Sequence, residues 1–220
     1  MKSAEELAAI VSDSPSVAAL FRQVTPWDRL VVVGGRVRNA LLDVRDESAD
    51  VDVMVDDATL ALLWSREMPN ASRNRHGNMR LASEIFKADI FSPGSFYDGF
   101  TSFDAAIAFF DLDVNAVGIA FGAKPNVVDP AGAVAALAAR VVTPNKKRWE
   151  WTAAGVEQAV LRARLLKFLL RNPDFRCGDP TLPLQRLDEL FDEYPSVVDH
   201  HVGLPSARAA HELRARLEQP

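Results

Sequence analysis

Cysteine is almost absent from the sequence, which contains Cys177 alone among 220 residues. A single cysteine cannot form a disulfide within the chain, and it argues against a zinc site built from thiolates. Long apolar runs are also missing, since none approaches the roughly 18 residues that a membrane-spanning helix needs. The first residues include Glu5 and Glu6 and lack the basic start and apolar stretch of a secretion signal. We therefore expect a cytoplasmic protein without membrane contact.

Positive charge is in short supply, because 25 Lys and Arg residues face 30 Asp and Glu residues and give a formal net charge of −5. This balance argues against a protein coated with basic surface for nucleic acid. The cations gather in one segment: residues 146–176 contain 8 Lys and Arg against 3 Asp and Glu, whereas residues 1–145 contain 13 against 19. If RNA binds this chain, we expect its backbone to lie along residues 146–176.

Several motifs of common enzyme classes do not occur. The sequence has no G-x-G-x-x-G fingerprint, no nucleophile elbow around a serine or cysteine, and no Cys/His spacing of a metal site. Dinucleotide-binding, hydrolase and zinc-enzyme interpretations therefore have little support.

The residues that are present predict strands mixed with helices, followed by helices alone. Residues 1–24 predict one or two short helices, interrupted near Ser14-Pro15. The length allows one large domain or a larger and a smaller one. Because strand signals become sparse from Trp149 onward, we expect three segments. They are an N-terminal helical segment at 1–24, a head domain at 25–145 and a helical domain at 146–220.

Within the head, apolar alternation and turn residues predict the individual elements. Strands are expected at "LVVV" (30–33), "DVDVMV" (50–55), "MRLAS" (79–83), "IFKADIF" (85–91) and "NVVDP" (126–130). Helices are expected over 36–43, from Asp56 or Asp57 to before Pro69, over "DAAIAFFDLDVNAVGIAF" (104–121) and over 131–142. The polar stretch 69–78 is expected to be a loop. In the last segment, Val156, Val160, Leu161, Leu165, Phe168 and Leu169 predict the buried stripe of a helix.

One stretch of the head combines two features that suit phosphate chemistry. A strand that enters Gly34-Gly35 and then a helix gives a backbone whose amides are not covered by side chains, as anion sites require. Asp50 and Asp52 lie on one side of the next strand, and paired carboxylates are ligands that Mg²⁺ prefers. Each feature alone is common in proteins of other function, and their order and closeness carry the argument.

"GGRVRNALL" followed by "DVDVMV" resembles the head domain of the poly(A) polymerase and CCA-adding enzyme group, in the polymerase-β nucleotidyltransferase superfamily. "FFDLDVNAVGIAF" and "NVVDPAGAVAAL" are similar to later stretches of that head, and "VLRARLLKF" is similar to the start of its neck. The resemblance runs in order over roughly residues 30–170, and no single motif carries it. It implies an α+β fold: a polymerase-β-like nucleotidyltransferase head, with a mixed sheet backed by helices, followed by a small helical neck-like domain.

The resemblance also implies a reaction and a site. A nucleoside monophosphate would pass from a nucleoside triphosphate, ATP or CTP, to a hydroxyl acceptor, with release of pyrophosphate. Two Mg²⁺ ions would steady the reacting oxygens. The residues implied as catalytic metal ligands are Asp50, Asp52 and, on a neighbouring strand, Asp89, with Asp104 as the fallback. The residues implied in nucleotide binding are Gly34, Gly35, Arg38, Asp111 and Asn115, of which Asn115 could equally be a structural cap.

Some positions depart from the family pattern. Its aspartate after Val-Arg is Asn39, its paired arginines are Phe109 and Phe110, and its base-selecting element is not found near Gly155 to Ala159. The acceptor therefore stays open between an RNA 3′ end such as that of tRNA, a protein and a small molecule. The alternative is a catalytically degenerate nucleotide- or RNA-binding module, or a structural partner, that keeps the fold.

A last group of residues is ambiguous. His76 has Arg73, Arg75 and Arg80 around it in the sequence and could contact phosphate. A surface loop is the simpler interpretation of this stretch. Asp89 could likewise pair with Lys87 on an exposed strand face instead of binding metal.

Overall fold

The computed structural model describes residues 2–24, 30–44, 50–74, 76–97, 99–178 and 187–203, together with 208 and 211. Its contacts divide the chain into two compact units. The first unit runs to Phe110 and includes Asn115–Val134; the second consists of Asp111–Val114 and the chain from Ala135 onward. None of the helices in the described ranges is both long and apolar enough to cross a membrane.

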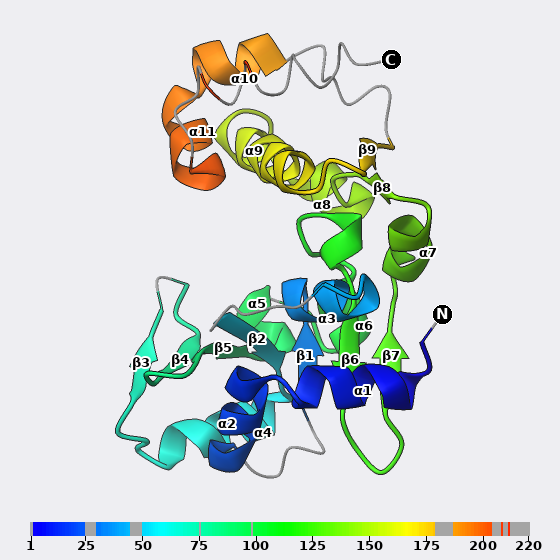
Figure 1. The fold of residues 1–220 in the computed structure, drawn as a ribbon. Coiled ribbons are helices and arrows are strands. Elements are labelled where there is room, and N and C mark those ends of the chain that lie inside the picture. Colours follow the sequence, from blue (N-terminus) through cyan, green and yellow to red (C-terminus); the bar gives the residue numbers. More distant parts are fainter. Residues whose placement is uncertain are drawn as a thin grey trace. The chain divides into compact units, whose positions relative to one another are not determined.

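The first unit is built on a mixed β-sheet. In the described part of the chain its seven strands follow the order β3-β4-β5-β2-β1-β6-β7 (Figure 1). Neighbours β2 and β5 run parallel, and the other neighbouring pairs are antiparallel. The strands are β1 (Val31–Val33), β2 (Asp50–Met54), β3 (Ala71–Arg73), β4 (Met79–Ala82), β5 (Lys87–Phe91), β6 (Gly118–Ala120) and β7 (Asn126–Val128).

Alternate strand residues pack on opposite faces of this sheet. On one face, Val32, Val51 and Val53 share a core with apolar side chains of the first four helices. On the other face, Val31 and Met54 share a core with residues of α6 and with aromatic side chains near α5. The helices are α1 (Ala4–Ser12), α2 (Pro15–Gln23), α3 (Gly35–Leu41), α4 (Asp57–Ser65), α5 (Pro93–Phe96) and α6 (Phe103–Ile107).

The second unit is mainly helical. A short 3₁₀ turn, η2 (Asp113–Asn115), and helix α7 (Ala133–Ala138) lie where the chain passes between units. The remaining elements are β8 (Val141–Val142), α8 (Lys146–Trp151), α9 (Val156–Arg171), β9 (Arg176–Cys177), α10 (Leu187–Glu193) and α11 (Pro195–Val202). Helix α9 packs against α11 through Ala159, Ala163 and Leu166, which share a core with Val198 and Val202.

Most elements predicted in the head are confirmed. The helical pattern of the first residues breaks at Ser14-Pro15, where α2 begins with proline in its first turn. Asp56 caps α4 as expected, because its carboxylate accepts a hydrogen bond from the amide of Thr59 at 2.7 Å. The strands β1, β2, β4, β5 and β7 all lie within their predicted stretches.

Three predictions are wrong. The stretch 69–78 is not wholly a loop, since it contains β3, which pairs with β4. The stretch 104–121 is not one helix, because α6 ends at Ile107 and the chain then forms η2 and β6. Val156 begins α9 but is 59% exposed, so it does not belong to the buried stripe.

Candidate active site

The glycine pair forms a tight turn between β1 and α3. Gly34 has φ of 71° and ψ of −136°, a conformation that glycine adopts without the strain that a side chain would bring. Its amide donates to the carbonyl of Val117 at 2.9 Å, so that this N–H continues the pairing of β1 with β6. The part of Gly34 in any phosphate cradle is therefore to turn the chain into α3, and its own amide is already engaged.

The two aspartates of β2 lie beside this turn. Asp50 and Asp52 are exposed on one face of the strand, and Val51 and Val53 between and after them are buried on the other. Asp52 is paired with Val33, the residue before the turn. A Cβ built on Gly34 would lie 3.8 Å from Oδ2 of Asp52. The carboxylate of Asp52 thus borders the glycine turn directly.

Arg38 lies against the same turn from α3. Its Nε and Nη2 donate to Oδ1 of Asn39 at 3.0 and 2.8 Å, and its Nη1 donates to Oδ1 of Asn115 at 2.6 Å. A Cβ built on Gly35 would lie 3.5 Å from Nη2 of Arg38. Asn39, which replaces the family aspartate, still holds this guanidinium, and Asn115 anchors it from the other side. The structure therefore brings Gly34, Gly35, Arg38 and Asn115 together.

A buried arginine supports the start of β2. The side chain of Arg36 is buried, and its guanidinium donates to the hydroxyls of Ser14 and Ser16 at 3.2 and 3.0 Å. Its Nη2 also donates to the carbonyl of Asp50 at 3.2 Å. One side chain of α3 thus ties the start of α2 to the first aspartate of the site.

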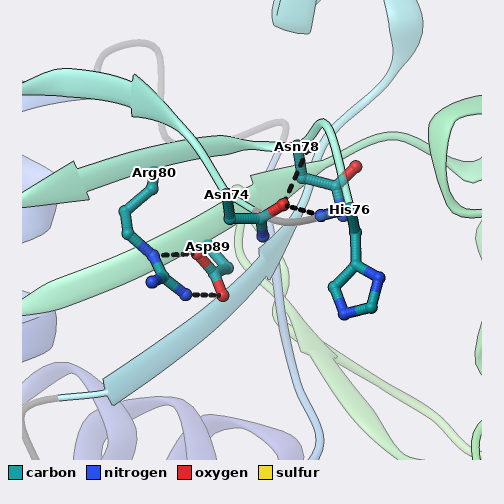
Figure 2. A network of polar contacts seen from close by, with 5 residues as sticks. All are labelled: Asn74, His76, Asn78, Arg80 and Asp89. Atoms are coloured by element: carbon teal, nitrogen blue, oxygen red, sulfur yellow. Dashed lines mark hydrogen bonds and ion pairs between the residues drawn. The ribbon is translucent and has the colours of Figure 1, made fainter.

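Asp89 lies on β5 directly opposite Asp52, because the two residues are partners in the parallel pairing of β2 with β5. Its carboxylate accepts two hydrogen bonds from Arg80 on β4, from Nε to Oδ1 and from Nη2 to Oδ2, both at 2.7 Å (Figure 2). These hydrogen bonds raise the pKa of the Arg80 guanidinium, and the charges of Asp89, Asp50 and Asp52 raise it further against a lowering by burial. Arg80 therefore lies within the field of all three carboxylates.

A metal site with three carboxylate ligands stays a prediction. Within the described ranges, no group of three or more His, Cys, Asp or Glu side chains is arranged to hold a metal ion. Asp89 pairs with Arg80 rather than with Lys87, which was the alternative suggested by the sequence. Asp104, the fallback ligand, is exposed in the first turn of α6.

Aromatic rings occupy the position where the family pattern has arginines. The ring of Phe110 would lie 3.6 Å from a Cβ on Gly34, so it borders the turn as Asp52 does. Phe110 packs against Phe96 with ring centroids 5.4 Å apart, and Phe109 packs against Tyr97 at 4.8 Å. The glycine turn thus has a carboxylate and an apolar ring as its neighbours.

The β3–β4 turn near Arg80 is ordered by Asn74. Its side-chain oxygen accepts hydrogen bonds from the amides of His76 and Asn78 at 2.9 and 3.0 Å. Figure 2 shows the His76 ring pointing away from the Arg80–Asp89 pair. The interpretation of Arg73 as a loop residue is wrong, because it lies on β3, whereas Arg80 lies on β4 within the strand predicted at 79–83.

Asp111 belongs to the second unit, where its carboxylate holds an arginine. Its Oδ2 accepts a hydrogen bond from Nη1 of Arg164 on α9 at 2.7 Å. Burial lowers the pKa of Lys167 on the same helix, and the charges of Arg171 and Arg164 lower it further. Cations of α9 are therefore close enough to repel one another.

A groove lies in the first unit, away from these residues. Its volume is about 450 Å³, and Phe21 and Arg22 of α2 and Phe121 and Pro125 of the β6–β7 turn contribute to its lining. Phe121 donates its amide to Leu30, before β1, whereas the glycine pair follows β1. The groove contains none of the predicted site residues.

Comparison with known proteins identifies the fold. No family model matches the sequence, and no curated protein matches it. Solved structures of similar fold include a CCA-adding enzyme in complex with ATP, with a TM-score of 0.66 and 20% identity, which covers 91% of this chain and 50% of that one. Another is a CCA-adding enzyme with CTP, with a TM-score of 0.67, 17% identity and coverage of 96% and 54%. A third is the Thermotoga maritima CCA-adding enzyme complexed with tRNA, with a TM-score of 0.60, 20% identity and coverage of 98% and 51%.

The chain shares the fold of the CCA-adding enzymes. The expected fold class, with a mixed sheet backed by helices in the head, is confirmed. The chain spans about half the length of these solved structures. At identities of 17–20% the likeness concerns the fold, and the chemistry has to be argued from the residues of this chain.

Sequence reasoning missed the parts played by Arg36 and by the Arg80–Asp89 pair. A signal for the pair exists, because a four-residue connection at residues 83–86 between two strands places Arg80 opposite Asp89. No comparable signal exists for Arg36, because its partners Ser14 and Ser16 precede it by 22 and 20 residues in the sequence.

Proposed function

We propose that this chain is a metal-dependent nucleotidyltransferase, which transfers a nucleoside monophosphate from a nucleoside triphosphate to a hydroxyl and releases pyrophosphate. The observation that carries the proposal is the contact between Asp52 and the glycine turn: Oδ2 lies 3.8 Å from the position of a Cβ on Gly34. A carboxylate for a metal and a turn for a phosphate are the two parts that such a reaction needs side by side.

Asp50 and Asp52 would hold the metal. Both are oxygen donors on exposed positions of one strand face, which is the donor chemistry that Mg²⁺ takes. Bound there, the ion would offset the charge of the phosphate oxygens near the reacting phosphorus. The two carboxylates keep a fixed spacing because they belong to a central strand whose start is tied to Arg36.

The other residues of the site would bind the nucleotide. We assign the triphosphate to the turn of Gly34 and Gly35 and to Arg38, with Asn115 orienting the guanidinium at 2.6 Å. The acceptor hydroxyl oxygen attacks the α-phosphorus, the bond from that phosphorus to the pyrophosphate oxygen breaks, and the hydroxyl proton passes to a carboxylate oxygen of β2.

Substitution of the two aspartates tests the proposal. Asp50→Asn and Asp52→Asn should each abolish incorporation of a radiolabelled nucleotide into pooled RNA with Mg²⁺ present. Thermal unfolding should change little, because both side chains are exposed. Unchanged incorporation by both variants would refute the assignment of Asp50 and Asp52 as metal ligands. Asp57→Asn, on the exposed start of α4, is the matched control and should incorporate as the unmodified protein does.

A second candidate is a nucleotide- or RNA-binding module without catalysis. Phe110 favours it, because an apolar ring borders the glycine turn where the family pattern has a phosphate-binding arginine. Such a module would bind a triphosphate analogue with Mg²⁺ but would label no acceptor in the same incubation. For either candidate, the excess of Lys and Arg over Asp and Glu in residues 146–176 suits RNA as the partner of the second unit.

A further inference from the structure

Arg80, Asp89 and Asp52 form a row across three neighbouring strands. Arg80 is paired with Asp89 between β4 and β5, and Asp89 is paired with Asp52 between β5 and β2. Residues that are partners in register project from the same face, so the row lies on the face that carries the candidate site. Figure 2 shows the guanidinium of Arg80 and the carboxylate of Asp89 turned toward each other.

Arg80 and Asp89 form a bidentate ion pair. The Nε and Nη2 atoms of Arg80 donate to separate oxygens of Asp89 at 2.7 Å. A metal ion that took either oxygen would have to displace or share a charge-assisted hydrogen bond. The side chain of Arg80 is nevertheless 38% exposed, and its Nη1 lies outside the fork. The guanidinium can therefore accept a further anionic partner while it stays fixed by Asp89.

The strand order determines on which side of Asp52 the guanidinium of Arg80 lies. The sequence β4-β5-β2-β1 puts Arg80 on one side of Asp52 and the glycine turn on the other. The triphosphate is assigned to the turn, and an in-line transfer brings the acceptor from the opposite side of the reacting phosphorus. An anion beside Arg80 would then belong to the acceptor.

We infer that Arg80 binds a phosphate of the acceptor strand, next to the hydroxyl that reacts, and that Asp89 is a positioning residue for Arg80 and not a metal ligand. The inference rests on the proposed function for the place of the triphosphate. It favours a polynucleotide 3′ end over an unphosphorylated protein or small-molecule hydroxyl, because every internucleotide linkage of a polynucleotide carries a phosphate beside the terminal hydroxyl.

The control for charge is Arg73. It lies on β3, one strand beyond β4, and its partner in register is Met79, so it belongs to the other face of the sheet from Arg80. Its guanidinium stacks over Trp64 at 4.6 Å. Like Arg80→Gln, Arg73→Gln removes one positive charge. It does so from an adjacent strand and leaves the row of Arg80, Asp89 and Asp52 unchanged.

Three binding measurements on the full chain test the inference: a short fluorescein-labelled single-stranded RNA by anisotropy, a non-hydrolysable ATP analogue by calorimetry, and Mn²⁺ by electron paramagnetic resonance. Arg80→Gln should weaken RNA binding about tenfold, the loss expected for a charge-assisted hydrogen bond to phosphate. Affinity for the analogue should stay the same, and Mn²⁺ affinity should not fall, because the variant removes a positive charge near the carboxylates of β2. RNA binding by Arg73→Gln should stay the same.

Asp89→Asn separates positioning from metal binding. Mn²⁺ affinity should fall far less than tenfold, because the variant removes a neighbouring charge and not a ligand. RNA should bind no more weakly, because a negative charge is removed. At saturating RNA the kcat for nucleotide incorporation should fall while KM for RNA does not rise, since Arg80 has lost its anchor. A tenfold loss of Mn²⁺ affinity in Asp89→Asn would overturn the inference and restore Asp89 as a ligand.

Other results overturn it as well. Equal losses in Arg73→Gln and Arg80→Gln would mean a general charge effect, and absence of RNA binding by the unmodified chain would remove the acceptor strand. Neither result bears on the affinities for Mn²⁺ and for the ATP analogue, which are the measurements that test the proposed function. Conversely, a chain that binds RNA through Arg80 but neither Mn²⁺ nor the analogue would refute the nucleotidyltransferase alone.

Discussion

Replacement of Gly34 by alanine separates backbone strain from crowding in the glycine turn. The added Cβ would meet Phe110 at 3.6 Å and Asp52 at 3.8 Å, which are ordinary contact distances. Space is therefore sufficient, and the cost comes from φ of 71° with ψ of −136°. A side chain in this region costs about 1–3 kcal/mol, of which alanine recovers about 0.4–1 kcal/mol by restricting the unfolded chain.

The expected net loss is about 1–2 kcal/mol, or roughly 2–8 °C in Tm for a chain of this size. Part of the strain can be relieved by rotation of the turn, which would move the start of α3 away from Asp52. A displacement of this kind should weaken binding of an ATP analogue by about tenfold to a hundredfold. Differential scanning fluorimetry and calorimetry measure the two effects.

Gly132→Ala is the matched control. Gly132 belongs to the same unit and has φ of 76°, and no described atom lies within 4 Å of a Cβ built there. Both variants place a side chain at a positive φ and should lose stability, but only Gly34→Ala should lose nucleotide affinity. A Tm equal to that of the unmodified protein in Gly34→Ala would refute the strained turn, and equal losses of affinity in both variants would refute its part in binding.

Further predictions concern a buried cation, a partly buried acid and the basic segment. Arg36→Lys should cost about 2–3 kcal/mol in unfolding free energy, because one ammonium cannot reach acceptors on α2 and β2 together, whereas Arg22→Lys on an exposed position should cost nothing measurable. Burial raises the pKa of Asp113, so its stabilising contribution is greatest below the ordinary carboxylate pKa and is lost as pH rises through the raised value. The difference in Tm between the unmodified protein and Asp113→Asn should therefore shrink as pH rises, and a growing difference would contradict this. If RNA lies on α8, Lys146→Glu with Lys147→Glu should reduce the slope of log affinity against log salt by about 1.4, and an unchanged slope would argue for another acceptor.

The elements that sequence reasoning predicted correctly are those whose signals are local. The run of β-branched residues before Gly34-Gly35 predicts β1, because the signal for this strand lies in consecutive residues. The alternation around Asp50 and Asp52 predicts both a strand and the face on which the carboxylates lie. The neighbouring turn and acids of the candidate site were therefore within reach of the sequence.

The elements that it missed depend on pairing between distant residues. Strand β3 has no apolar alternation and forms because Ser72 pairs with Arg80 across the hairpin. Strand β6 lies in a stretch that is apolar on every side, so periodicity cannot distinguish it from a helix. Its first residue, Gly118, shows why a strand forms here. A Cβ on Gly118 would lie 2.8 Å from the side chain of Val31, so only glycine lets β6 pair this closely with β1. Such close contact cannot be read from the neighbours of Gly118 in sequence.

The exchange of arginine for phenylalanine changes how the proposed site would neutralise a triphosphate. A phosphate at the glycine turn has the ring of Phe110 and the carboxylate of Asp52 as neighbours, and neither attracts an anion. Arg38 is the nearby cation, and its guanidinium already donates to Asn39 and Asn115. The divalent ion on β2 would then offset a large share of the charge of the nucleotide, because the described neighbours of a Cβ on Gly34 are an apolar ring and a carboxylate. Triphosphate binding and metal binding would therefore be one coupled event in this chain, whereas a turn bordered by arginines could hold the nucleotide before the metal arrives.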